Sequence, residues 1–274
     1  AIKGAFASRP SPALGAEAKA LAAAGAKELV LVAQDVTQYG KPGRRKLLTL
    51  LDELEKVQGS AWIRLMYLYP EGISHTLLKR IGAGGKVVPY LDIPIQHIDN
   101  RVLRRMKRGT SEKSVRKLMD DVATLAPDTA LRTTIITGFP GEDDAAFKKL
   151  ADFIREVRFH HLGVFPFSPE PGTEAATLDR QLPKQVRTSR VNKLLGIQKK
   201  LSLKRNEALV GTTLEVLVEA VSDESDLVHY GRTQFQAPEV DGVVYLEMFE
   251  GKPGNFVDVE IVSAGDYDLV GRPV

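Results

Sequence analysis

Residues 87–109, VVPYLDIPIQHIDNRVLRRMKRG, decide the fold of this chain. The apolar run 87–95, interrupted by two prolines, ends in the polar pair Gln96 and His97 before Asn100 opens a basic helix. Short apolar runs with β-branched residues are typical of strands buried in a parallel sheet, and ligands of such sheets bind beyond the carboxyl ends of the strands. We therefore expect Gln96 and His97 to lie at a functional end of the sheet; the alternative is that they merely cap a strand.

The composition is that of a globular protein. At 274 residues, with 43% hydrophobic and 27% charged side chains, the chain is long enough for one large domain and a small one. No apolar run approaches the roughly 18 residues of a membrane span and no signal sequence opens the chain, so we expect a soluble, cytoplasmic protein with no membrane partner. The lack of cysteine excludes disulfides and thiolate metal sites within these residues.

The net charge of +3 hides an asymmetry between two parts of the chain. Residues 1–202 hold 33 basic and 21 acidic side chains, or +12, whereas residues 203–274 hold 5 basic and 14 acidic ones, or −9. A basic body can approach nucleic acid or another polyanion, but a module at −9 repels phosphate and should prefer a basic partner.

Strand and helix patterns alternate through the first part of the chain. We expect strands at 28–33, 62–68, 87–95, 130–139 and 161–167. Helices are expected between them at 11–24, with Ser11 as N-cap, and at 47–57, 74–82, 101–107, 111–125 and 143–157. Five such units indicate an α/β fold with a parallel sheet and right-handed crossovers, predicted as a partly closed (β/α) barrel over residues 1–202. A doubly wound open sheet is the alternative.

The last part of the chain has a different pattern of expected secondary structure. A turn-rich segment at 168–183 is expected to wrap over the mouth of the barrel before a long helix at 184–208. Short alternating strands then follow at 212–221, 241–249 and 255–264 without helices of useful length. This pattern predicts a small all-β barrel of the OB-like kind over residues 203–274.

Candidate binding residues gather at the predicted strand ends. Gly138 and Gly141 introduce a helix whose free N–H groups, beside Glu142, could receive an adenosine or a carboxylate, although glycine at such turns is common for geometric reasons alone. Gln34 and Asp35, Gln96 and His97, and Arg132 are expected at the same barrel end. This set suits a zwitterionic amino-acid ligand; the alternative is an internal ion pair between Arg132 and Asp35.

Histidines and a basic helix are weaker signals. His160 and His161 would point to opposite faces of a strand, so we expect no shared metal ion, and none at His75 or His229. The basic helix face at 101–108 is either a solvated surface or a surface that attracts RNA or an anionic cofactor.

Six stretches together resemble the methylthiotransferase family of radical S-adenosylmethionine enzymes. They are GAFASRP at 4–10, LVAQDVTQYG at 31–40, DIPIQHIDNRVLRRMKRG at 92–109, RTTIITGFPGE at 132–142, FSPEPGT at 167–173 and QAPEVDG at 236–242. AQDVTQYG and DIPIQH resemble the branch that modifies a ribosomal protein aspartate, where the tRNA-modifying branch usually has GQN and PVQSG. The resemblance implies a radical S-adenosylmethionine barrel followed by a TRAM barrel that contacts the substrate, and methylthiolation of the β-carbon of an aspartate in the twelfth small-subunit ribosomal protein.

The chain departs from this family in one respect. The family needs two four-iron four-sulfur clusters, and no cysteine is present to hold either. The resemblance places Ala1 shortly after the CxxxCxxC motif, so we expect the first barrel strand, the cluster loop and an N-terminal cluster domain to be missing, and the chain alone to be inactive. In the complete enzyme, the resemblance implies that one cluster cleaves S-adenosylmethionine to a 5′-deoxyadenosyl radical and the other supports sulfur insertion.

Site residues can be carried over from the family without a catalytic residue being assigned. The resemblance puts Gln34 and Asp35 near the methionine amino group. It puts Gln96, His97 and Arg132 along the cofactor cavity, and Gly138, Gly141 and Glu142 beside the adenosine. Arg232, Gln236 and Asp241 are expected to face the basic ribosomal protein or the assembled small subunit. The alternatives are methylthiolation of tRNA adenosine and a cluster-free binding protein that uses the barrel as a scaffold.

Overall fold

The large part of the molecule is a partial barrel of five parallel strands. The structure, a computed structural model, describes residues 7–40, 45–222 and 225–274, so the first three residues of the GAFASRP motif lie outside the described residues. The strands are β1 (Glu28–Leu31), β2 (Trp62–Leu65), β3 (Tyr90–Asp92), β4 (Ala130–Thr137) and β5 (His161–Pro166). β1 pairs with β2, and β3, β4 and β5 pair in that order. Val88 N donates to Ile63 O at 3.0 Å and joins the two groups.

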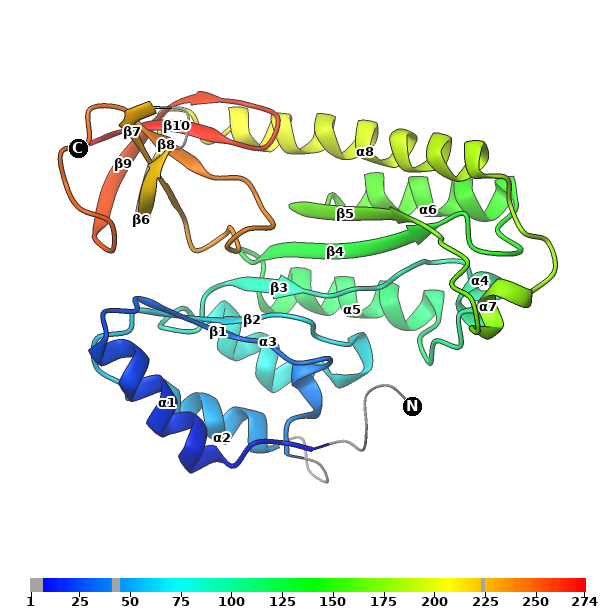
Figure 1. The fold of residues 1–274 in the computed structure, drawn as a ribbon, viewed down its shortest axis with the longest axis horizontal. Helices are drawn as coiled ribbons and strands as arrows, with labels where there is room; N and C mark the ends of the chain where they lie inside the picture. Colours follow the sequence, from blue (N-terminus) through cyan, green and yellow to red (C-terminus); the bar gives the residue numbers. More distant parts are fainter. Residues whose placement is uncertain (1–6, 41–44, 223–224) are drawn as a thin grey trace.

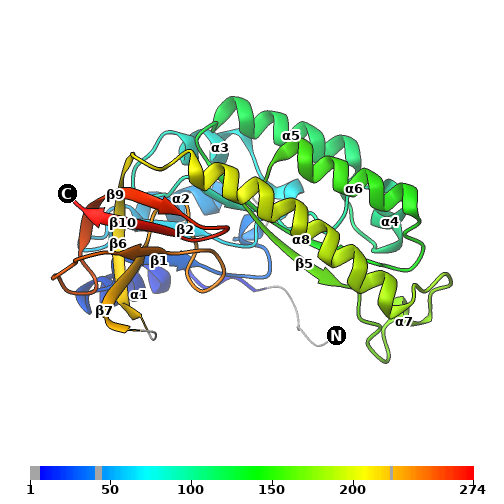
Figure 2. The ribbon, with the colours of Figure 1, turned by 90° about the horizontal axis from the view of Figure 1, so that it is seen from above.

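Spatial order therefore follows chain order, which confirms the partial barrel. A doubly wound sheet would reverse its strand order partway through the fold. Figure 2 shows α5 (Glu112–Leu125), α6 (Asp144–Val157) and α8 (Lys184–Glu207) side by side outside the strands. The remaining helices are α1 (Ser11–Ala23), α2 (Arg45–Leu54), α3 (His75–Gly82), α4 (Asn100–Arg105), α7 (Glu174–Thr177) and the short turns η1 (Val36–Gln38) and η2 (Pro70–Gly72).

Local chemistry explains where the elements begin and end. Ser74 and Ser111 cap α3 and α5 by accepting from backbone N–H groups. The expected cap at Ser11 is wrong, because α1 already begins at Ser11 after Pro10, and the Ser11 hydroxyl donates to Glu53 instead. The predicted strand 87–95 is regular only over Tyr90–Asp92. Pro89 and Pro94 flank this piece and have no N–H for a ladder.

The two faces of the sheet differ in chemistry. Alternate residues such as Leu29, Ile63 and Leu91 face the helices and form the main core. The opposite, inner face carries Trp62, Arg64, Tyr90, Asp92 and Arg132, several of them charged and buried. A charged inner face needs partners from elsewhere in the chain.

The small C-terminal domain supplies these partners. Its strands are β6 (Thr213–Ser222), β7 (Ser225–Arg232), β8 (Val244–Leu246), β9 (Phe256–Ala264) and β10 (Leu269–Pro273), closed in the order β10-β8-β7-β6-β9. Figure 1 shows this small barrel beside the amino ends of the parallel strands. The domain boundary placed between 202 and 203 lies inside α8 and stays a prediction. No helix among the described residues could cross a membrane.

Candidate functional site

The carboxyl ends of β1 to β5, which we call the mouth, bring several expected residues together. Asp35 and Ile95 line one cavity of about 280 Å³, and so do Lys107 and Arg108. Asp35 is already occupied as the cap of η1, accepting from Thr37 N at 2.9 Å and from Thr37 Oγ1 at 2.6 Å. Gln34 is exposed beside it. The carboxylate of Asp35 therefore shapes the loop after β1.

Gln96 is the clearest candidate for ligand contact. Its backbone continues the ladder, because Gln96 N donates to Thr134 O and Ile136 N donates to Gln96 O, both at 2.9 Å. Its φ is 67°, a left-handed conformation that non-glycine residues seldom adopt and that recurs at functional sites. The side chain is buried, and its Oε1 has no hydrogen-bond partner in the described part of the chain. It lines a second cavity of about 210 Å³, which shares Lys107 and Arg108 with the first.

His97 and Glu142 lie behind the mouth and hold it together. Asp99 N donates to His97 Nδ1 at 3.0 Å, so the ring hydrogen belongs on Nε2, which is 3.3 Å from Glu142 Oε2. The Glu142 carboxylate also receives three hydrogen bonds, from Thr137 Oγ1, Gly138 N and Arg190 Nη1 at 2.9, 2.9 and 2.6 Å. Both side chains are fully buried. They connect the end of β4 to α8.

The protonation state of Glu142 follows from these contacts. Burial by itself raises the pKa of this carboxyl, but the contact with the ring of His97, the charge of Arg190 and the hydrogen bond from Thr137 outweigh burial and lower the pKa below its ordinary value. Glu142 is therefore ionised at neutral pH. Its negative charge is matched by the buried guanidinium of Arg190.

The backbone conformation and packing of the turn after β4 require glycine at two positions. Gly138 and Gly141 have φ of 75° and 86°. A Cβ at Gly138 would lie 2.3 Å from Arg187 Cγ, and one at Gly141 would lie 2.9 Å from Arg105 Nε. Glycine is needed here for backbone conformation and for close approach by two arginines. That the turn borders an adenosine stays a prediction.

Arg132 does not lie at the mouth, so the expectation that it shares a strand end with Gln96 is wrong. It is the third residue of β4, paired in register with Asp92 and His161. Gly138 lies six positions further along the chain, about 20 Å on an extended strand, and Ile135, the bridge partner of Gln96, lies three positions further along. Its Nη1 donates to Asp92 Oδ1 at 3.0 Å, and its Nε is 3.4 Å from Asp241 Oδ1, so the pair with Asp35 is not formed.

The three residues expected to face the substrate lie in the junction, by which we mean the contact between the small barrel and the inner face. Arg232, 2% exposed, donates to Gln236 O and to Glu28 Oε2, both at 2.6 Å. Gln236 Oε1 accepts from Thr233 N at 3.0 Å. Asp241 accepts from the Tyr90 hydroxyl at 2.6 Å. Contact of these residues with a substrate stays a prediction.

Sequence reasoning missed the barrel side of this junction. Arg64, with no exposed surface, donates to Glu28 Oε1 at 2.6 Å and to Gln234 O at 2.9 Å. Trp62 packs edge-to-face on Phe256 with ring centroids 5.0 Å apart. The available signal was the alternation of Glu28, Arg64 and Asp92 with apolar residues inside short strands, which marks a polar face that another domain must cover.

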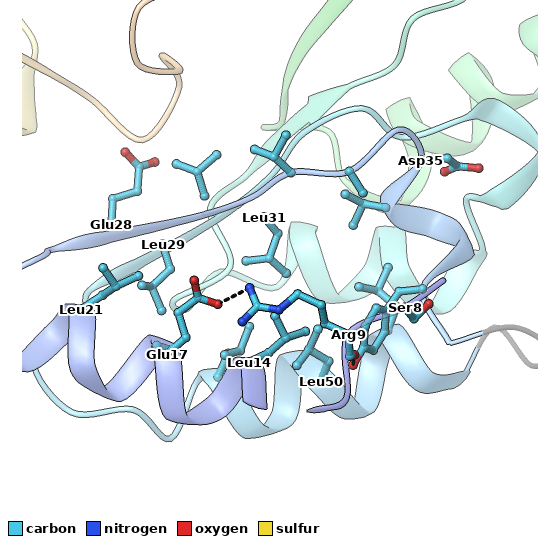
Figure 3. Close-up of a pocket in the computed structure, with 18 of the residues that line it drawn as sticks. Ser8, Arg9, Leu14, Glu17, Leu21, Glu28, Leu29, Leu31, Asp35 and Leu50 are labelled. Carbon is cyan, nitrogen blue, oxygen red and sulfur yellow. Dashed lines mark hydrogen bonds and ion pairs between the residues drawn. The ribbon is translucent and has the colours of Figure 1, made fainter. Parts of the chain in front are cut away.

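A larger groove lies along β1. Figure 3 shows this cavity of about 480 Å³, bounded by α1, α2 and β1, with Leu14, Leu29, Leu31 and Leu50 on its walls. Among the described strands β1 pairs only with β2, so its other edge is open. Val32, directly after β1, is 64% exposed. An open parallel edge beside an apolar groove is a place where another strand can pair.

Comparisons with known proteins agree with this architecture. Residues 3–154 match the radical SAM superfamily and residues 210–274 match the TRAM domain. The chain is 44% identical over 273 residues to a Geobacter sulfurreducens protein named ribosomal protein uS12 methylthiotransferase RimO, covering 99% of this chain and 61% of that protein. An Aquifex aeolicus protein of the same name is 43% identical over 274 residues, covering 99% of this chain and 63% of that protein. The chain thus spans less than two thirds of these relatives.

A solved structure supports the fold. Coproporphyrinogen III oxidase (HemN) from Escherichia coli, described as a radical SAM enzyme, aligns with a TM-score of 0.55 at 15% identity. The alignment covers 81% of this chain and 59% of that chain. It indicates that the two proteins share a fold.

Proposed function

This chain belongs to the radical S-adenosylmethionine superfamily, and from that premise we propose that it is the barrel and TRAM part of a methylthiotransferase acting on an aspartate of ribosomal protein uS12. The observation that carries the proposal is the identity of 44% along essentially the whole chain to proteins named for this activity. The AQDVTQYG and DIPIQH motifs and the charge of −9 over residues 203–274 support a basic protein substrate over tRNA.

The residues present fit S-adenosylmethionine but not an iron–sulfur cluster. The chain has no cysteine, and its described residues contain no group of three side chains able to hold a metal ion. Two clusters would therefore be bound by parts of the complete protein outside this chain. For S-adenosylmethionine, the unpartnered Gln96 Oε1 offers an acceptor, and Arg108 offers a cation to a carboxylate beside Lys107, which already pairs with Glu174. When bound, this cofactor supplies the radical and methyl chemistry of the family.

The residues of this chain would orient the bound cofactor and enclose it at the mouth. Glu142 holds Gly138 N and Thr137, so the turn after β4 keeps one shape beside the mouth. Gln96 presents its amide from a backbone that the ladder fixes on both sides. Phe139 and Phe167, with ring centroids 4.9 Å apart, form part of the apolar wall there and exclude water.

The groove along β1 would receive the cluster-bearing segment as an additional parallel strand. The open edge of β1 and the apolar walls in Figure 3 support this arrangement. The chain alone is then inactive for two reasons, because it has no cluster ligands and because its barrel is open at this edge.

The test compares the complete protein with this chain after anaerobic reconstitution with iron and sulfide. We expect iron and methylthiolation of uS12, detected by intact mass spectrometry, for the complete protein and neither for the chain alone. Modification of tRNA in place of uS12 would establish the tRNA alternative. A complete protein that binds no iron would support the cluster-free alternative.

A further inference from the structure

A separate cavity of about 340 Å³ lies at the junction, away from the mouth. It is formed by the amino ends of β4 and β5, the middle of α8 and two loops of the small barrel. The residues that matter here are Arg132, His161, Gln198, Asp241, Tyr267 and Asp268. The proposed reaction at the mouth uses none of them.

Gln198 presents an acceptor without a donor. It is 1% exposed, and its Nε2 donates to Phe159 O at 3.0 Å and to His160 O at 3.1 Å. These two bonds fix which end of the amide carries nitrogen. Its Oε1 has no hydrogen-bond partner among the described residues. A buried acceptor of this kind normally finds a donor, from the protein, from water or from a ligand.

His161 and Asp241 show the same deficit of donors. His161 Nε2 lies 2.8 Å from Phe235 O and must donate to it, which leaves a lone pair on Nδ1. Burial lowers the pKa of His161 more than Asp241 raises it, so the ring is neutral near pH 7. Nδ1 faces Asp241 Oδ1 at 3.4 Å. That oxygen has an ion-pair contact with Arg132 Nε, also at 3.4 Å, but no donor in the described part of the chain forms a hydrogen bond to it.

Charge and shape favour a cation with several donors. The carboxylates of Asp241 and Asp268 line the cavity together with the guanidinium of Arg132, which pairs with Asp241 and with Asp92 beside the cavity, so three carboxylates face one cation. The guanidinium of Arg205 donates hydrogen bonds to the carbonyls of Phe159 and Arg158, next to His160. Tyr267, 47% exposed, offers an aromatic face at the cavity. A guanidinium can donate in several directions at once and stack on an aromatic ring.

We propose that this cavity binds the guanidinium of an arginine from the protein substrate, as a docking site distinct from the mouth. The inference rests on the proposed function for the identity of the partner. β5 pairs only with β4 among the described strands, so its outer edge is open between the cavity and the mouth. Its six residues, His161–Pro166, span about 20 Å. An extended substrate segment of similar length would reach from the docked arginine to the reacting aspartate.

The first test is calorimetric titration of the chain with N-acetyl-arginine amide. N-acetyl-citrulline amide keeps the shape and removes the charge, and we expect it to bind at least about tenfold more weakly. Gly163 lines the cavity, and a Cβ there meets ordinary contacts at 3.4 to 3.9 Å, so Gly163→Leu should fold and fill the space. Gly196→Leu, at an exposed position in α8 with nothing within 4 Å of its Cβ, is the matched control.

The proposal expects binding by the wild-type chain and the Gly196 variant, and at least a tenfold loss in the Gly163 variant. Absence of binding, equal binding of citrulline amide, or undiminished binding by the folded Gly163 variant overturns it. Equal binding of N-acetyl-lysine amide overturns the assignment to a guanidinium.

A second measurement separates this inference from the proposed function. In the complete reconstituted enzyme, Gly163→Leu should raise KM for uS12 several-fold and leave kcat unchanged. An unchanged KM in an enzyme that does modify uS12 overturns the docking role. An enzyme that binds arginine amide at this cavity but never modifies uS12 refutes the proposed function and leaves the cation site in place.

Discussion

Replacing Glu142 by glutamine should destabilise the large domain strongly. The carboxylate accepts three hydrogen bonds and neutralises Arg190, whose side chain is 6% exposed. In Glu142→Gln an amide NH₂ opposes Gly138 N, and Arg190 keeps only the exposed Asp144 as a carboxylate partner. Breaking a buried pair by removing one partner costs about 3 kcal/mol or more. We expect a loss of about 3 kcal/mol in the free energy of unfolding.

The assay is urea unfolding at pH 7 followed by circular dichroism. Glu156→Gln is the matched control, because that side chain is 61% exposed and pairs with Arg116 at the surface. It should cost less than about 0.5 kcal/mol. A loss below about 1 kcal/mol for Glu142→Gln would refute the anchoring role.

The pH dependence gives an independent check. Because the pKa of Glu142 is lowered in the folded state, its stabilising contribution is fully present above its ordinary value of 4.5. That contribution is lost as the pH falls through the lower folded pKa. The difference between wild type and Glu142→Gln should therefore shrink in acid. A difference that stays constant or grows there contradicts the ionic explanation.

Three further predictions concern the mouth and the junction. Gly138→Ala should cost more stability in thermal unfolding than Gly84→Ala, since both have φ near 75° but only Gly138 has a neighbour in the way; equal losses would exclude the contact with Arg187. Burial and then Asp241 raise the pKa of Tyr90, so an ultraviolet titration should find this phenol still protonated above pH 10, with stability falling as the unfolded state ionises; normal titration in the folded chain would contradict this. Gln96→Leu should change stability by less than about 1 kcal/mol, because its Oε1 has no partner to lose, yet weaken S-adenosylmethionine binding to the complete protein at least about tenfold in equilibrium dialysis; unchanged binding would remove Gln96 from the cofactor site.

Local patterns predicted most of the large domain. Apolar periodicity placed every strand of the partial barrel, and the helices expected at 74–82 and 111–125 begin within one residue of those bounds as α3 and α5. Strand ends were less predictable. Pro89 and Pro94 shortened β3 on both sides, which a hydrophobic pattern alone does not register.

Parts of the small barrel were missed for a different reason. β7 (Ser225–Arg232) and β10 (Leu269–Pro273) contain glycine, proline or charged residues that weaken a strand pattern. These strands are held by ladder bonds to neighbours with clear patterns, such as β6 and β9. Pairing across the sheet overrode their weak local preference.

The sequence predicted the position of Gln96 at the mouth but not the partners of Arg132. Gln96 lies where the end of a parallel strand predicts a ligand contact. For Arg132, the sequence showed a cation in a strand but not which partners it would find. Asp92 and Asp241 meet it from 40 and 109 positions away in the chain, and such long-range pairing has no local signal.

The ion pair between Glu28 and Arg232 has a consequence for how the molecule folds. These residues are 204 positions apart, and Arg232 adds a second guanidinium to the pair that Glu28 of β1 already forms with Arg64 of β2. During synthesis the early strands emerge long before residue 232 leaves the ribosome. The polar inner face of the sheet, with its ion pairs, therefore stays exposed to water until the small barrel docks, and closing so long a loop is slow. The large domain therefore reaches its final packing only after the small C-terminal barrel has been synthesised and has docked.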